Sequence, residues 1–278
     1  MTAYKYATLA EYKAYIQARG TDAVVTDTSD DTIINNLLEQ ASRYLDGQTQ
    51  RTFYPRIESQ SLDLPRDREL FFDRYTDVLE VVSLTNGDST SIAASAYNLI
   101  PYNYTPKYSL KIKEGSSVTW EADSSNNTEA VVTLTSWNGC HDKYADAWVS
   151  VGTLGAAITD TTTLAFTATA GHSIEAGRLY KVDDEMFLIN TVVTNTITPF
   201  ARGAFGSTAA THLISTVVYE WQNIARDACI EIANTAYHRR FGESVQSAQT
   251  VTASGIVLTP REIPQLAKEF IELYTRLE

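Results

Sequence analysis

One segment of the sequence gathers residue types that could perform chemistry. Residues 202–212 read RGAFGSTAATH, with an arginine at one end and a histidine at the other. A phosphate-binding loop of the Walker type needs a lysine beside its serine or threonine, and this segment contains none. A serine nucleophile needs a positioned histidine and a carboxylate, and the sequence offers Ser207 and His212 no third partner. The segment is therefore predicted to close a β-turn.

The glycines of this segment fit that structural role. Gly203 and Gly206 allow a positive φ in a turn, and Arg202 and His212 would hydrogen-bond across the loop or lie at its surface. On this interpretation Ser207→Ala and His212→Ala leave assembly nearly intact. Gly203→Val should instead harm folding, because a β-branched residue is strained at positive φ.

No catalytic, metal or cofactor site is predicted elsewhere, so the chain is not expected to be an enzyme. Asp183, Asp184 and Glu185 are adjacent, but they lack the alternating oxygen ligands and bend glycine of a calcium loop. They are expected to be solvated. Cys140 and Cys229 lie far apart without a CxxC motif, which argues against a disulfide framework and a zinc site.

The composition sets limits on the class of protein. A length of 278 residues suggests two or three structural units. The net charge of -12 argues against a general nucleic-acid binder, but it allows a surface past which DNA slides without sticking. There is no signal-peptide pattern at the N-terminus and no apolar run of the roughly 18 residues that span a membrane. We therefore expect a soluble protein that folds in a cytoplasm.

The two ends of the chain are predicted to be helical. Thr8 and Glu11 form a capping box ahead of one helix, and a second helix is expected from about Asp30 to Gly47, with a wide apolar stripe. Helical spacing returns at Tyr219, and a last helix is expected from about Pro264 because proline fits only the first turn.

Between these ends the sequence shows the residue pattern that is typical of β-strands. The runs LEVVSL, YSLKIK and EAVVTLTSW are separated by turn residues. A threonine-rich stretch that includes RLYKV, EMFLINTVV and TITPFA follows. The predicted class is α+β, with a small helical bundle of N- and C-terminal helices interrupted by a large β-rich insertion. The expected domains are a helical half at 1–54, a β-rich insertion at 55–148, a small all-β module at 149–220 and a second helical half at 221–278.

The N-terminal helices resemble those of the head–tail connector proteins of long-tailed double-stranded DNA bacteriophages. The resemblance rests on the segment TLAEYKAYI, an acidic gap, and a helix that ends in a spaced pattern of Tyr44, Gly47, Thr49, Arg51 and Phe53. The C-terminal segments ARDACIEIANTAYHRRFGE and IPQLAKEFIELYTRL are similar to the other half of such proteins.

The threonine-rich stretch resembles a small β module that recurs in phage virion proteins. The residues that carry this resemblance are Gly177, Glu185, Met186, Thr196, Thr198, Arg202, Gly203, Gly206, Thr208 and His212.

The connector resemblance implies a virion structural protein at the capsid vertex or neck, assembled in the host cytoplasm. It would form a dodecameric ring that binds the portal, extends the channel through which double-stranded DNA passes, and contacts a tail terminator or stopper protein. The last helix would dock on the portal through the apolar stripe Leu266, Phe270, Leu273, Tyr274 and Leu277.

A basic cluster closes the preceding helix. His238, Arg239 and Arg240 lie where cations favour the negative end of the helix dipole. Arginines near aromatic rings can also grip phosphates. These residues are therefore candidate contacts with a neighbouring subunit or with the lumen of the ring, and pairing with a neighbouring acidic subunit is favoured.

A second interpretation belongs to another class of protein. The chain could be a β-rich module of a phage tail or baseplate that binds carbohydrate or the host surface. Its 16 tyrosines suit contact surfaces, because tyrosine combines apolar area with a polar tip. This alternative predicts an exposed aromatic platform in the β-rich insertion.

Overall fold

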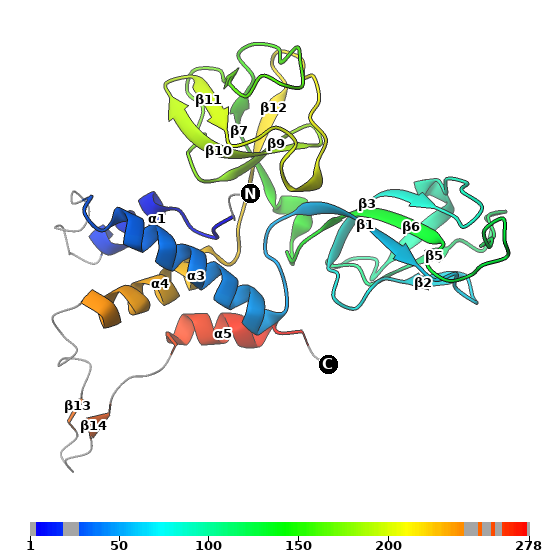
Figure 1. Cartoon of the computed structure of the whole chain (residues 1–278), viewed down its shortest axis with the longest axis horizontal. Helices are drawn as coiled ribbons and strands as arrows, with labels where there is room; N and C mark the ends of the chain where they lie inside the picture. The colour runs from blue at the N-terminus through cyan, green and yellow to red at the C-terminus, as the bar shows by residue number, and fades with distance from the viewer. Residues whose placement is uncertain (1–3, 19–27, 242–249, 252–256, 259–262, 277–278) are drawn as a thin grey trace. The chain divides into compact units, whose positions relative to one another are not determined.

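The computed structural model describes residues 4–18, 28–241, 250–251, 257–258 and 263–276 (Figure 1). It combines α-helices with several antiparallel sheets, which confirms the predicted α+β class. The chain divides into two compact units, one made of Met1–Gln50 with Asn223–Glu278 and the other of Arg51–Gln222.

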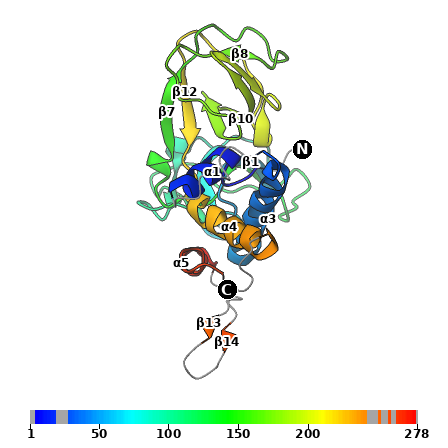
Figure 2. The ribbon, with the colours of Figure 1, turned by 90° about the vertical axis from the view of Figure 1, so that its left-hand side faces the viewer.

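The first unit is mainly helical. Within the described residues its helices are α1 (Leu9–Ala18), α3 (Asp31–Thr49), α4 (Arg226–Phe241) and α5 (Gln265–Tyr274), and its short strands are β13 (Thr250–Val251) and β14 (Val257–Leu258). Helices α3 and α4 lie side by side in both Figure 1 and Figure 2. The capping box is confirmed, because the Thr8 amide donates to the Glu11 carboxylate at 2.7 Å and the Glu11 amide donates to Thr8 Oγ1 at 3.2 Å.

Apolar side chains of α3 form much of this unit's core. The buried apolar residues of α3 are Ile34, Leu37, Leu38, Ala41 and Leu45. They recur at helical spacing, so burial of one stripe explains why this segment is a helix.

The second unit begins with two three-stranded antiparallel sheets. One has the order β1 (Arg56–Leu62), β6 (Val132–Asn138), β3 (Val78–Thr85), and the other has the order β2 (Glu69–Phe71), β5 (Ser109–Ile112), β4 (Tyr97–Ile100). Short 3-10 turns lie at Ala94–Ala96 and Tyr144–Asp146. Side chains from both sheets share one core, which includes Leu70, Leu84, Leu110 and Leu134.

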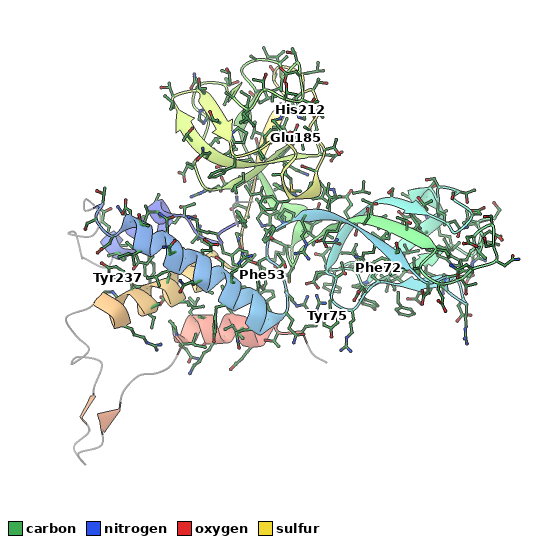
Figure 3. The ribbon with its side chains drawn as sticks, in the orientation of Figure 1. Phe53, Phe72, Tyr75, Glu185, His212 and Tyr237 are labelled. Atoms are coloured by element: carbon green, nitrogen blue, oxygen red, sulfur yellow. The ribbon has the colours of Figure 1, made fainter. Side chains whose placement is uncertain are left out.

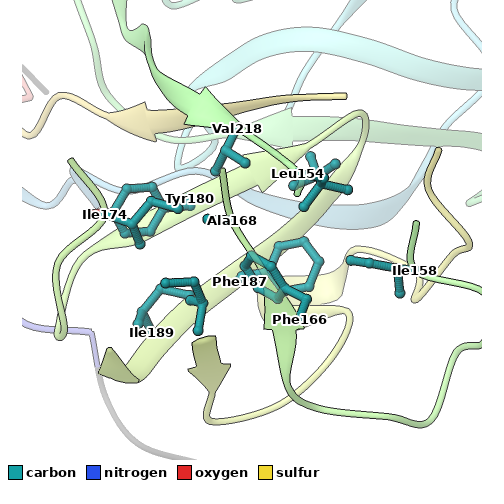
Figure 4. Close-up of a cluster of buried hydrophobic side chains, with 11 residues drawn as sticks. Leu154, Ile158, Phe166, Ala168, Ile174, Tyr180, Phe187, Ile189 and Val218 are labelled. Carbon is teal, nitrogen blue, oxygen red and sulfur yellow. The ribbon is translucent and has the colours of Figure 1, made fainter. Parts of the chain in front are cut away.

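The rest of the second unit is a six-stranded antiparallel sheet. Its order is β7 (Trp148–Thr153), β12 (Val217–Trp221), β9 (Leu179–Val182), β10 (Glu185–Val193), β11 (Thr196–Pro199), β8 (Phe166–Thr167). The first and last strands also meet, because Leu154 and Ala168 form an antiparallel bridge. The sheet therefore closes into a small barrel whose interior holds Tyr180, Phe187 and Val218 (Figure 4).

Two predicted helix boundaries were wrong. The helical spacing that starts at Tyr219 is not used there, because Val217–Trp221 pairs with β7 and β9 as strand β12, and α4 begins only at Arg226. Helix α3 continues past Gly47 to Thr49 and ends where Gln50 takes a φ of 54°.

Candidate functional site

The C-terminal helix α5 leaves part of its apolar surface exposed. Ala267 is its buried residue, whereas the side chains of Leu266 and Leu273 are 46% and 74% exposed. These leucines are seven positions apart, so they lie on one side of the helix. Phe270 and Tyr274 are half-buried, and their ring centroids are 4.6 Å apart.

The structure thus places four of the five predicted portal-interface residues on one helix that contacts α3 and α4. Leu277 lies outside the described residues. The Arg276 amide donates to the Thr49 carbonyl at 3.1 Å, which ties the end of α5 to the end of α3. The helix is therefore anchored at one end while Leu266 and Leu273 face solvent.

The basic cluster lies at the end of α4, as the sequence predicts. His238 and Arg239 are exposed. The ring of Tyr237 meets the ring of His238 edge-on at 5.8 Å, and the Tyr237 hydroxyl donates to Asp30 at 2.6 Å. The side chain of Arg240 lies outside the described residues.

The segment 202–212 takes part in a buried polar cluster of the barrel. Glu185 opens strand β10 after a tight turn in which Asp183 has a φ of 49°. Arg202 follows β11, and His212 exchanges backbone hydrogen bonds with Ile158. Figure 3 labels both Glu185 and His212 in the barrel.

Glu185 is the acceptor at the centre of this cluster. Arg202 reaches both of its carboxylate oxygens, at 2.7 Å from Nε and 2.8 Å from Nη2. The backbone amides of Gly203 and Ala210 donate to the same carboxylate, each at 2.9 Å, and His212 Nε2 lies 2.9 Å from Oε2. The expectation that Glu185 is solvated was wrong, because its side chain is fully buried.

These bonds also set the ionisation of Glu185. Burial by itself would raise the pKa of the carboxyl, but the hydrogen bonds from Arg202, the Ala210 amide, His212 and the Gly203 amide outweigh it. The pKa of Glu185 is therefore lowered, and the buried group is held as a carboxylate.

His212 bridges two carboxylates. Its Nδ1 lies 2.8 Å from Asp183 Oδ2, opposite the contact of Nε2 with Glu185, and its side chain is only 1% exposed. The predicted cross-loop bonding is confirmed for Arg202, which donates to the Ala210 carbonyl at 2.6 Å. A surface position for either side chain was wrong, because Arg202 is 5% and His212 is 1% exposed. Removal of the buried His212 ring would leave its polar partners without a hydrogen bond, so we now expect His212→Ala to destabilise the barrel.

Ser207 is not arranged as a nucleophile. Its hydroxyl donates to the Ala204 carbonyl at 2.8 Å and accepts from the Met186 amide at 2.9 Å. Gly203 and Gly206 have φ values of 60° and 84°, as predicted for turn glycines. Segment 202–212 therefore stabilises the barrel through side-chain hydrogen bonds, in addition to closing a turn.

Among the residues that the structure describes, no group of three His, Cys, Asp or Glu side chains is placed to hold a metal ion. Within the same ranges, none of the helices has the length and apolar character needed to cross a bilayer.

Compared with protein-family models, with curated proteins and with solved structures, the chain matches none of them.

Proposed function

We propose that the chain is a structural protein of a tailed-phage virion, a connector subunit that forms a ring on the portal. The ring extends the DNA channel and offers a surface to the tail or to a stopper protein. In this proposal the helices of the first unit form a small bundle into which the β-rich region is inserted. The observation that carries the proposal is the exposure of Leu266 and Leu273 on α5.

An exposed apolar helix face favours a partner. Complete burial of one leucine contributes about 1.5–3 kcal/mol, so two leucines in each subunit add up quickly around a ring. Such contacts close when each subunit meets the next through two different surfaces. Arg239 and Arg240 offer positive charge for those contacts in a chain whose net charge is -12.

The same net charge suits the channel. DNA phosphates are repelled by an acidic surface and are not retained by it. A chain with 34 acidic against 22 basic residues therefore allows DNA to pass without adhering.

Native mass spectrometry of the full chain mixed with purified portal protein tests the proposal. We expect a complex that carries several copies of the chain. The double substitution Leu266→Ser, Leu273→Ser should abolish it while the isolated variant keeps its helical circular dichroism, because both side chains are exposed. Glu272→Ala is the matched control on the same helix and should bind normally. A wild-type chain that forms no complex with the portal would count heavily against the proposal.

Assembly in infected cells gives an independent test. A chain truncated after about Pro264 should keep its β-rich unit but fail to join the head. The heads should fill with DNA, then leak it, and should carry no tails. If the truncated chain is found at the necks of tailed particles, α5 is only part of its own unit and the docking role is wrong.

A further inference from the structure

One end of the sheet β2–β5–β4 carries a concentration of exposed aromatic side chains, which we call the aromatic end. Its members are Phe71 (64% exposed), Tyr75 (64%), Tyr102 (66%), Tyr104 (73%) and Tyr108 (56%). Large aromatic side chains at this exposure leave apolar area in water, which typically marks a binding surface when they are grouped.

Backbone pairing brings these residues to the same end of the sheet. The Phe72 amide donates to the Tyr108 carbonyl at 2.9 Å, so β2 ends beside the start of β5. The Tyr108 amide donates to the Ile100 carbonyl at 2.9 Å, so the loop that carries Tyr102 and Tyr104 begins there too. Tyr75 follows β2 in a turn closed by the Thr76 amide and the Asp73 carbonyl at 2.9 Å.

Hydrogen bonds hold this loop in one shape. Lys107 Nζ donates to the Pro101 carbonyl at 2.6 Å, and the Lys107 amide donates to the Val78 carbonyl at 2.6 Å. The exposed rings are therefore carried on a braced backbone, which lowers the entropy lost on binding.

Phe71 also lines an open hollow of about 770 Å³ beside β2. Three basic and four acidic residues line the same hollow, among them Arg68, Glu69, Asp73 and Lys111. Several are fixed by neighbours. Arg68 donates to the carbonyls of Lys113 and Ser116 at 2.8 and 3.0 Å, and Glu69 accepts from Ser109 Oγ at 2.6 Å.

The side chains that line the hollow indicate which class of ligand it can bind. A nucleic acid or another polyanion needs a basic surface, whereas the acidic residues here outnumber the basic ones. The cores of protein interfaces are poor in Asp, Glu and Lys, whereas these types make up five of the fourteen residues that line the hollow. A polyol with an apolar ring face matches both the aromatic ring and the charged donors and acceptors.

We propose that the hollow binds a neutral oligosaccharide. The ring of Phe71 lies against the C–H face of one sugar, Lys111 donates to sugar oxygens, and Glu69 and Asp73 accept from hydroxyl groups. The tyrosines of the aromatic end do not line the hollow, and in this proposal they offer contacts only to sugar units that extend beyond it. This function is separate from portal binding, so the two can fail independently.

The full chain should be applied to an array of short neutral and acidic glycans, and the affinity for each bound neutral glycan measured by calorimetry. We expect binding to neutral glycans only. Phe71→Ala and Phe71→Leu should each weaken it about tenfold or more, because neither residue has a flat ring face, whereas Phe71→Trp should retain it. Lys111→Ala should also weaken binding.

Phe200→Ala is the matched control, since Phe200 is an exposed phenylalanine of the barrel that does not line the hollow. It should leave affinity unchanged. Thermal unfolding should be the same for all these variants, because each replaced side chain is exposed. Absence of binding to every neutral glycan overturns the proposal, as does binding that Phe71→Ala leaves intact. If the wild type binds no glycan and Phe71→Ala loses contact with another virion protein, the surface is a protein interface instead.

Discussion

Arg202 donates a hydrogen bond to each oxygen of the Glu185 carboxylate, and the two side chains are only 5% and 0% exposed. A guanidinium and a carboxylate in this forked geometry form the strongest common type of ion pair. In the barrel this pair is enclosed, so the loss of either partner leaves a buried charge uncompensated.

Glu185→Gln should therefore destabilise the barrel strongly. The amide keeps the size of the side chain but removes the charge that balances Arg202, and such losses cost about 3–5 kcal/mol. Chemical unfolding followed by fluorescence should detect this, because Trp148 and Trp221 lie on strands of the barrel. Asp184→Asn removes the carboxylate that is adjacent to Glu185 in the sequence and whose side chain is exposed. This control should change the free energy of unfolding by less than about 0.5 kcal/mol. Equal effects of the two substitutions would contradict the role of the buried pair.

The stability of the barrel should fall in acid. The pKa of Glu185 is lower in the folded state, because hydrogen bonds from Arg202, Ala210, His212 and Gly203 outweigh burial. The folded state therefore binds this proton less readily than the unfolded chain, whose glutamate pKa is about 4.3. The stabilisation is complete above that pH and is lost as pH falls through the folded pKa. The free energy of unfolding should fall less steeply below about pH 4.3 in Glu185→Gln than in the wild type.

Gly203 should tolerate no side chain. At its φ of 60°, an added Cβ would lie 2.7 Å from the Ser207 carbonyl oxygen and 2.8 Å from the Ala209 nitrogen. Gly171 has a φ of 83° but has open space around an added Cβ, so Gly171→Ala measures the backbone strain alone. Gly203→Ala should lower the melting temperature clearly more than Gly171→Ala, and Gly203→Val more still. Similar melting temperatures for the two alanine variants would show that the loop adjusts.

Neither cysteine should react in the folded protein. Cys140 and Cys229 are free and buried, and burial raises the pKa of each thiol to about 12. The reactive thiolate is therefore scarce at neutral pH. A thiol reagent should label neither residue in native buffer and both after denaturation. Rapid labelling of one cysteine in the native protein would reveal local opening around it.

Local signals in the sequence predicted several elements well. The capping box of Thr8 and Glu11 forms as expected, the run EMFLINTVV is strand β10, and α5 begins directly after Pro264. In each case the signal and the structure involve residues that are close in the sequence.

Non-local pairing explains the main errors. The helical spacing expected from Tyr219 includes residues 219–221, but their pairing with β7 and β9 overrides it. Glu185 was expected to be solvated. Its partners Arg202 and His212 follow 17 and 27 positions later, so no local pattern linked them to it. One signal could have suggested that the three residues meet. Glu185, Arg202 and His212 all belong to the set of residues that resembles a phage β module. Sequence spacing alone could not reveal that these side chains meet.

Arg202 also donates through Nη1 to the carbonyls of Asp160 and Thr163, at 3.1 and 3.0 Å, while Nη2 reaches the Ala210 carbonyl. One guanidinium thus acts as a non-covalent cross-link between the loop before β8, the start of β10 and the loop after β11. A fluctuation that frees any of these segments must break bonds to the others. Amide protons of the three segments should therefore exchange with solvent deuterium together, through one cooperative opening of the barrel.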